Sequence, residues 1–88
     1  MRLQLPVKLT QIDAMAFLRQ LPASPSDGAW VVDAQATQGI DSATLAVLMH
    51  LKRQAQAAGA AFSVQGASES LLELARVYGV AEWLLGVK

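Results

Sequence analysis

The chain has 88 residues, 53% of them hydrophobic, and its seven basic residues are balanced by seven acidic ones. This length supports one small domain with a single core, which we expect to span residues 1–88. The zero net charge argues against binding to nucleic acid or to an anionic membrane surface. Because the chain has no cysteine, disulfides and thiolate metal sites are excluded, and a reducing compartment, the cytoplasm, is expected. No stretch resembles a signal peptide or approaches the roughly 18 apolar residues of a membrane span, so we expect membrane contact only through a partner.

The N-terminal part of the chain predicts one strand region and one helix. Residues 2–9 alternate between polar and apolar side chains, which is the pattern of a half-buried strand. Pro6 has no backbone N–H, so we expect either an edge strand or two short strands that meet near this residue. Residues 11–21 then carry apolar side chains at helical spacing, with Thr10 as the N-cap and Asp13 in the first turn.

A loop and a buried strand are predicted next. Residues 22–28 are rich in proline, serine and glycine, and we expect them to form the most mobile segment. Residues 30–32 are consecutive apolar residues, which favours a central, parallel strand covered on both faces. Asp33 follows at the strand's end, where its carboxylate can accept hydrogen bonds from the loop. That loop, residues 34–40, supplies Gly39 for a tight turn and returns an isoleucine to the core.

A long helix is predicted from residue 42 to about residue 58, with Asp41 or Ser42 as its N-cap. Its predicted apolar stripe consists of Thr44, Leu45, Val47, Leu48, Met49, Leu51 and Ala55. The side chains of His50, Arg53, Gln54 and Ala57 fall on the opposite face. Gly59 is placed to end the helix in a left-handed conformation.

The remaining segment predicts a short strand and two helices. Phe62 and Val64 alternate with polar residues over 60–65, as in a strand. The spacing of Ser70 and Glu73 is that of a capping box at the start of a helix. Its shared apolar face consists of Leu71, Leu74, Ala75 and Tyr78. Gly79 closes this helix, and a short terminal helix follows at residues 81–85.

The order strand, helix, strand, helix, strand, helix, short helix predicts an α/β domain with a parallel or mixed sheet of about four strands. The stretch VVDAQATQGIDSATLAVLMHL, together with the later LLELARVYGVAEWL, resembles the STAS domain family, named after sulfate transporters and anti-sigma factor antagonists. The resemblance spans residues 30–85. It includes an apolar strand that ends at Asp33, a loop of about seven residues, and the pair Asp41 and Ser42 that opens a helix.

Within this family, the short form of the chain and its LARVYGVAEWL ending are most similar to the small cytoplasmic subunits of phospholipid-transporting ABC systems of Gram-negative bacteria, which maintain outer-membrane lipid asymmetry. The resemblance implies a non-catalytic subunit without a cofactor that binds the ATPase subunit and supports its assembly or activity. It also implies that the chain reaches the inner membrane only through its complex. The family includes anti-sigma factor antagonists too, in which the serine matching Ser42 is phosphorylated by a kinase that is itself the partner. Both readings stay open.

A partner-binding surface is expected where the strand, the loop and the helix start converge. The predicted residues are Thr37, Gln38, Gly39, Asp41, Ser42, Ala43, Ala46 and His50, with Asp33 as a supporting carboxylate. For Ser42 three roles remain: an N-cap worth about 1 kcal/mol, a contact with the partner, or a phosphorylation site at a helix N-terminus. A phosphate there would be repelled by Asp33 and Asp41, and this repulsion could equally eject a partner.

A catalytic or metal site is the weaker interpretation. Paired carboxylates beside a hydroxyl occur in hydrolytic and phosphoryl-transfer sites. However, His50 lies two turns along the helix from Ser42 on the outer face, and no spacing brings a Ser-His-Asp triad together. Gly39 is a lone glycine and does not form a phosphate-binding loop. We therefore predict no catalytic residue, metal site or cofactor.

Two further expectations concern side-chain size. Family members often carry glycine where this chain has Thr44, in DSATL, so a β-branched side chain is expected to limit how closely a partner's backbone approaches. The aromatic residues Trp30, Tyr78 and Trp83 are expected to be core or semi-buried anchors, with a contact surface as the alternative for Trp83.

Overall fold

The computed structural model describes residues 2–20 and 28–86. Its main sheet has three parallel strands in the order β1 (Arg2–Gln4), β3 (Trp30–Asp33) and β5 (Phe62–Gln65). A second, two-stranded parallel ladder joins β2 (Lys8–Leu9) to β4 (Gly39–Ile40). The predicted α/β class with a parallel sheet is thus confirmed, with strands in groups of three and two in place of one sheet of about four.

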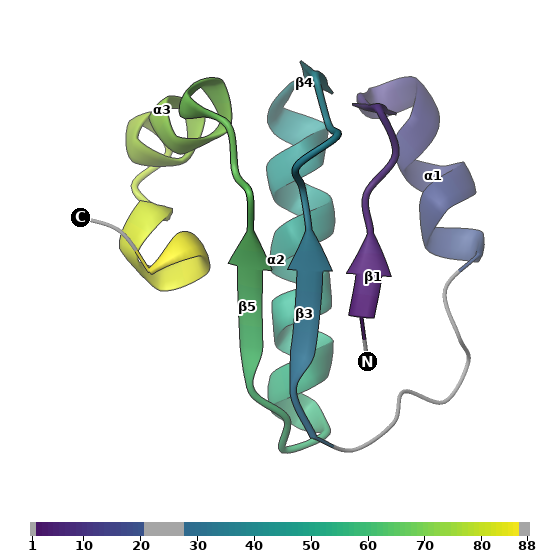
Figure 1. Cartoon of the computed structure of the whole chain (residues 1–88), viewed down its shortest axis with the longest axis vertical. Coiled ribbons are helices and arrows are strands. Elements are labelled where there is room, and N and C mark those ends of the chain that lie inside the picture. The colour runs from purple at the N-terminus through teal and green to yellow at the C-terminus, as the bar shows by residue number, and fades with distance from the viewer. Residues whose placement is uncertain (1, 21–27, 87–88) are drawn as a thin grey trace.

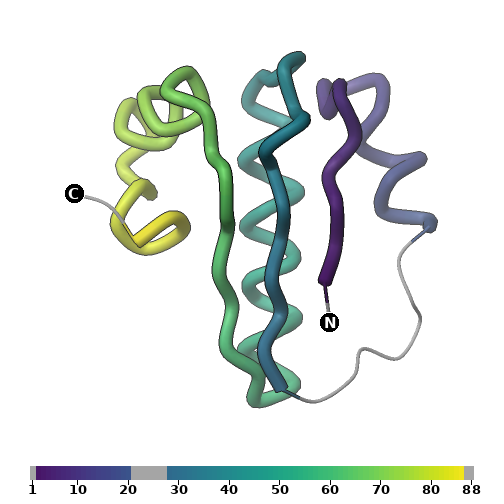
Figure 2. The backbone as a smooth tube through the Cα atoms, in the orientation of Figure 1, coloured from purple at the N-terminus to yellow at the C-terminus, as the bar shows by residue number. Residues whose placement is uncertain are grey.

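Four helices complete the described part of the chain: α1 (Gln11–Arg19), α2 (Ser42–Ala57), α3 (Glu69–Val77) and the π-helix η1 (Ala81–Leu85). Helix α2 runs along one face of the sheet, with α1 on one side of it and α3 and η1 on the other (Figure 1). The backbone tube shows the same arrangement, in which the strands form one layer and α2 lies behind them (Figure 2). No helix among the described residues has the length and apolar character that crossing a membrane requires.

The first strand region is divided at Pro6, as one of the two sequence predictions proposed. β1 pairs with β3, and β2 leaves the main sheet to pair with β4.

Helix α1 begins after Thr10, whose hydroxyl and amide both donate to the Asp13 carboxylate, at 2.9 and 3.4 Å. The expected end of this helix at Leu21 lies outside the described residues, as does the expected mobile loop over 22–28 except for Gly28.

The central strand β3 is parallel to both neighbours, but the described helices cover only one face of the sheet. Trp30 and Val32 are buried beneath α2, whereas Val31 and Asp33 on the other face are half-buried. The neighbours on that open face are polar and exposed: Arg2, Gln4, Ser63 and Gln65. The prediction of a strand covered on both faces is therefore wrong, because the flanking strands supply a polar surface on one side.

Helix α2 has the predicted apolar stripe. Six of its side chains are buried in the core, namely Thr44, Leu45, Val47, Leu48, Leu51 and Ala55. Met49 packs against this core, and His50, Arg53, Gln54 and Ala57 are exposed as expected. Gly59 follows the helix with a φ of +72°, the left-handed conformation that glycine adopts without strain.

Two predicted details of the C-terminal part are wrong. Helix α3 begins at Glu69, because the Ser68 hydroxyl accepts a hydrogen bond from the Leu71 amide at 3.2 Å and so serves as the N-cap. Ser70 consequently lies inside the first turn. Tyr78, expected on the apolar face, is 57% exposed because it follows the last helical residue. Trp83 is also partly exposed, while Trp30 is a core residue.

Candidate functional site

The region where the end of β3, the loop after it and the start of α2 converge is called the junction below. It is held by the β2–β4 ladder. The amides of Gln38 and Gly39 both donate to the Val7 carbonyl, at 2.7 and 3.0 Å, which fixes the end of the loop beside the N-terminal segment. Gly39 is in extended β4 and not in a tight turn as predicted; the turn comes earlier, where the Thr37 amide donates to the Ala34 carbonyl. A Cβ at Gly39 would lie 3.0 Å from Cγ of Lys8, so glycine permits the close approach of the two strands.

Asp41 is the N-cap of α2, which decides between the two candidate caps. Its Oδ1 accepts a hydrogen bond from the Ala43 amide at 2.8 Å. Its Oδ2 accepts a second one from the Gln11 amide at 3.1 Å, in the first turn of α1. One carboxylate therefore satisfies a free amide at the start of each helix and holds the two helix starts together.

Thr44 joins the same junction from inside. Its side chain is fully buried, and its hydroxyl accepts a hydrogen bond from the Asp41 amide at 3.1 Å while donating to the Leu9 carbonyl at 2.5 Å. In the parallel register of β2 and β4, the Asp41 amide would donate the next ladder hydrogen bond directly to the Leu9 carbonyl. The Thr44 hydroxyl lies between these two groups and bridges them. Thr44 therefore does not project toward a partner, and the expectation that it would limit a partner's approach is wrong.

Thr37 is also buried. Its hydroxyl donates to the Pro6 carbonyl at 2.8 Å and so fastens the loop to the N-terminal segment. Of the eight residues predicted to bind a partner, Thr37 does not present its side chain at the surface. Thr37 instead stabilises the loop that carries the surface residues.

The other predicted residues form a surface at the start of α2. Ser42, Ala46 and His50 are exposed and follow one another at a spacing of four residues, so they share one face of the helix. Gln38 is exposed on the preceding loop. Gly39, Asp41 and Ala43 are half-buried at the base of this surface. Because Asp41 performs the capping, the Ser42 side chain makes no hydrogen bond within the described residues.

Asp33 belongs to a different environment. Its Oδ1 accepts a hydrogen bond from the Gln35 amide at 2.9 Å, as expected for a carboxylate at a strand end. Its Oδ2 pairs with the Arg2 guanidinium at 3.3 Å on the open face of the sheet, and Arg2 also donates to Gln65 at 3.4 Å. Asp33 and Asp41 thus share no hydrogen-bond partner. Within residues 2–20 and 28–86, no group of three or more His, Asp or Glu side chains is placed to hold a metal ion.

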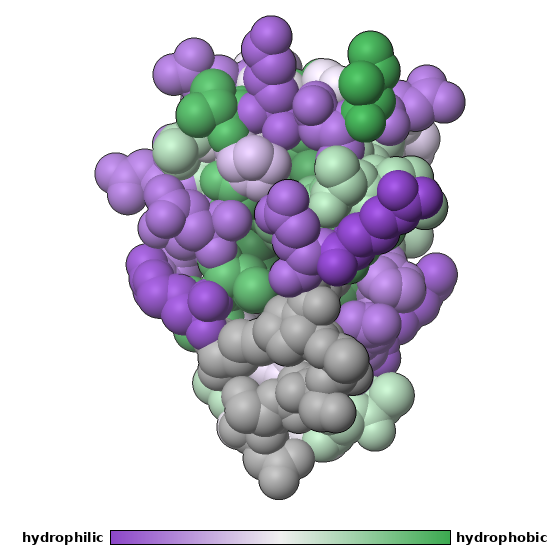
Figure 3. Space-filling model, turned by 90° about the vertical axis from the view of Figure 1, so that its right-hand side faces the viewer, coloured by the Kyte–Doolittle hydropathy of each residue, from purple (hydrophilic) through white to green (hydrophobic). Residues whose placement is uncertain are grey.

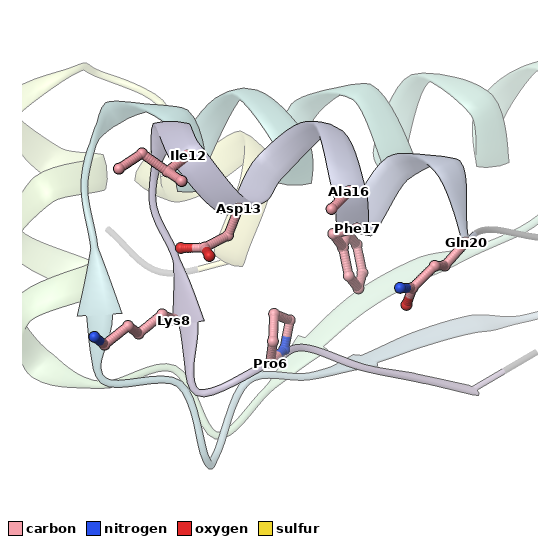
Figure 4. Close-up of a pocket in the computed structure, with 7 residues that line it drawn as sticks. All are labelled: Pro6, Lys8, Ile12, Asp13, Ala16, Phe17 and Gln20. Carbon is pink, nitrogen blue, oxygen red and sulfur yellow. The ribbon is translucent and has the colours of Figure 1, made fainter.

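An apolar surface that was not predicted lies beside the junction. Val7, Ile12 and Met15 are 55%, 90% and 58% exposed, although the sequence pattern suggested that such residues face the core. The face that carries α1 shows hydrophobic patches between hydrophilic side chains (Figure 3). A groove of about 230 Å³ runs between α1 and the β1–β2 segment. Its lining, shown in Figure 4, consists of Pro6, Lys8, Ile12, Asp13, Ala16, Phe17 and Gln20.

The sequence contains the apolar residues of this surface at helical spacing, but helical periodicity alone does not show that they face solvent. Ile12, Met15 and Ala16 recur at three- and four-residue spacing, which defines a helix face but not the direction in which it points. In the structure α1 packs on the core through Ala14, Phe17 and Leu18, and none of its residues is buried. The Gln11–Asp41 hydrogen bond brings the exposed Ile12 next to the start of α2.

A comparison with protein families identifies the chain. The family model described as "Mlab, STAS domain" matches residues 1–86. A search of curated proteins and a search of solved structures gave no match. STAS domains are small regulatory or accessory modules and are generally non-catalytic. The chain belongs to the STAS domain family and is most similar to its MlaB group.

Proposed function

We propose that this chain is a non-catalytic accessory subunit that binds the ATPase subunit of a phospholipid-transporting ABC complex and supports its assembly or activity. The similarity to the MlaB group is the reason for choosing this partner. In this proposal the chain is cytoplasmic and is held at the inner membrane only by its complex.

The observation that carries the proposal is that the Ser42 side chain is exposed and is not used to cap the helix. It is exposed at the first position of α2 and is released from capping by Asp41. The neighbouring positions on the same face are occupied by Ala46 and, one turn further, His50. Small side chains at the start of a rigid helix allow a partner's backbone to approach closely, and the helix N-terminus favours acceptor groups on that partner.

The surroundings of Ser42 suit a protein partner better than a small ligand. Gln38 supplies exposed polar groups, and the exposed Val7 and Ile12 supply apolar area. A core of apolar contacts beside polar ones is the usual composition of a protein interface. We expect the partner to cover the start of α2 and the adjoining part of α1 together.

The test is binding of the purified ATPase subunit of the host's phospholipid-transporting ABC complex, together with its rate of ATP hydrolysis. Ser42→Arg places a long charged side chain in the centre of the proposed surface and should weaken binding at least tenfold. Ala57→Arg is the matched control, because Ala57 is also exposed and lies at the far end of the same helix. If the ATPase subunit does not bind the unmodified chain, or if Ser42→Arg leaves the affinity unchanged, this proposal is wrong.

A second candidate is a phosphorylation-switched antagonist of an anti-sigma factor kinase. The observation that favours it is the exposed Ser42 hydroxyl, which forms no hydrogen bond with any residue that the structure describes. A phosphate there adds a charge of roughly −2 at a helix N-terminus that already carries the Asp41 carboxylate. Mass spectrometry of the protein from its native host tests this candidate. A phosphoryl group on Ser42 under some growth condition is the expected result, and its absence under every condition would count against this function.

A further inference from the structure

The two edges of the main sheet are protected differently. The β1 edge carries Arg2 and Gln4, is followed by Pro6, and has α1 beside it (Figure 1). Charged side chains and proline at an edge are common protections against pairing with another strand. The β5 edge has the sequence FSVQ, with neither a charge nor a proline. By its side chains it is the less protected of the two edges, although η1 lies beside it (Figure 1).

The register of β5 shows which of its backbone groups are available. The carbonyls of Ala61 and Gln65 accept hydrogen bonds from the amides of Trp30, in β3, and Ala34, directly after β3, at 2.7 and 2.8 Å. In a parallel ladder every second residue bonds to the same neighbour, so Phe62 and Val64 direct their N–H and C=O groups away from β3. No described residue forms a hydrogen bond with these outward groups.

A cleft of about 220 Å³ lies along this edge, between β5 and η1. Phe62 and Val64 line one wall, and Trp83 and Leu84 line the other. Lys52 of α2 fixes the second wall, because its ammonium group donates to the Trp83 carbonyl and lies 4.9 Å from the centroid of the Trp83 ring. The available backbone groups therefore lie beside a cleft that is lined about equally by polar and apolar atoms and whose second wall is held by Lys52.

We propose that the β5 edge receives an extended segment of the partner as an additional strand. The segment would bond to the outward groups of Phe62 and Val64, place alternate apolar side chains in the cleft, and place its polar side chains beside Ser63 and Gln65 on the open face. Only an extended backbone presents donors and acceptors at the spacing of about 6.6 Å that separates alternate strand residues. This inference rests on the proposed function, because the ATPase subunit is the partner that supplies the segment.

A second copy of the chain is the less suitable occupant. Pairing β5 with β5 would join two strands of only four residues. A stable protein interface buries about 1,200–2,000 Å² in total, far more than such a pair provides. A segment of a partner already bound at the start of α2 does not have to supply this area alone.

Amide hydrogen exchange followed by NMR tests the inference on the labelled chain, alone and in complex with the ATPase subunit. In the free chain, the amides of Ser63 and Gln65 should be protected by β3, and those of Phe62 and Val64 should exchange rapidly. In the complex, the amides of Phe62 and Val64 should slow at least tenfold. Gln4 is the matched control, since its amide points outward from the opposite edge and should remain fast.

Each other outcome overturns the inference. If the complex forms but Phe62 and Val64 still exchange rapidly, the edge is not used, although the proposed function stands. If no complex forms, the proposed function fails, and this inference fails with it. If protection of Phe62 and Val64 in the free chain rises with protein concentration, a second copy is the occupant.

A pair of variants gives an independent measurement. Val64→Pro removes an outward N–H from the β5 edge, and Gln4→Pro removes one from the β1 edge, so neither change breaks the β3 ladder. Circular dichroism first establishes that both variants are folded. Val64→Pro should then weaken binding of the ATPase subunit at least fivefold, and Gln4→Pro should not; equal affinities would contradict the inference.

Discussion

The Asp41 carboxylate accepts a hydrogen bond from the amide of Gln11, thirty residues earlier in the chain, while it caps its own helix through Ala43. The first turns of α1 and α2 are thereby joined through one side chain. The surface around Ser42 depends on this link, because it sets the position of α1 relative to the start of α2.

Replacing Asp41 by alanine should destabilise both helix starts at once. An N-cap contributes about 1 kcal/mol, and a hydrogen bond to a charged group about 1.5–3 kcal/mol. We expect Asp41→Ala to lower the free energy of unfolding by about 2 kcal/mol, measured by urea denaturation. Asp41→Asn keeps one carbonyl acceptor and should lose less than Asp41→Ala; if Asp41→Asn were as stable as the unmodified chain, the second hydrogen bond would contribute nothing.

Removing the buried hydroxyl of Thr44 should leave the Asp41 amide and the Leu9 carbonyl without this partner. Leaving a buried polar group unsatisfied costs about 1–3 kcal/mol. Thr44→Val, which keeps the shape of the side chain, should therefore lower the free energy of unfolding by at least about 1 kcal/mol. Thr44→Ser keeps the hydroxyl and loses only a methyl group. If valine were as stable as threonine in thermal unfolding, the inserted hydroxyl would not be a stabilising element.

Two glycines allow a close backbone contact to be separated from conformational strain. Gly59 and Gly66 have nearly the same φ, +72° and +71°, so alanine at either should meet a left-handed strain of about 1–2 kcal/mol. A Cβ at Gly59 would meet nothing within 4 Å, whereas one at Gly66 would lie 2.9 Å from Cβ and 3.0 Å from Cα of Gln35. Gly66→Ala should therefore be less stable than Gly59→Ala by at least about 1 kcal/mol in urea denaturation. Equal losses would mean that the loop containing Gln35 moves aside freely.

The helical part of the fold followed from the sequence because it depends on local periodicity. The buried stripe of α2, from Thr44 to Ala55, repeats at helical spacing and needs no knowledge of distant residues. The choice of Asp41 over Ser42 as the cap could not be predicted in the same way. It depends partly on the Gln11 amide, which comes near only in the folded chain.

The same reasoning explains the errors around the junction. Strand β4 has two residues and exists only because β2 lies beside it, so the local sequence predicts a turn at Gly39 instead of a strand. Periodicity predicts an apolar face for α1 but not the direction in which it points, so it does not predict the exposure of Ile12. The inward position of Thr44 follows from its place on the buried stripe, but its hydrogen bond to Leu9 depends on a strand 35 residues away.

Lys52 should contribute to the attachment of η1. Its ammonium group donates to the Trp83 carbonyl and faces the Trp83 and Phe62 rings at 4.9 and 6.0 Å from their centroids. Cation–π contacts are worth about 0.5–1 kcal/mol at exposed sites. Lys52→Met should accelerate amide exchange of Leu84 and Gly86 by about fivefold, with a smaller effect on α2.

Arg53→Met is the matched control for this change. Arg53 is the exposed neighbour of Lys52 and has no hydrogen bond or ion pair with the described residues. Its replacement should leave the exchange of η1 amides unchanged and alter stability by less than about 0.5 kcal/mol. Equal effects of the two variants would show that η1 is held by its buried residues, Ala81 and Leu84, alone.

The different burial of the two tryptophans makes them separate optical reporters. Trp30 is 1% exposed in the core, and Trp83 is 39% exposed on η1. A soluble quencher such as iodide should therefore reduce the fluorescence of Trp83 selectively, while the emission of Trp30 changes only when the core opens. The unmodified chain consequently allows events at the cleft beside β5 and unfolding of the whole domain to be followed in one cuvette, without an attached dye.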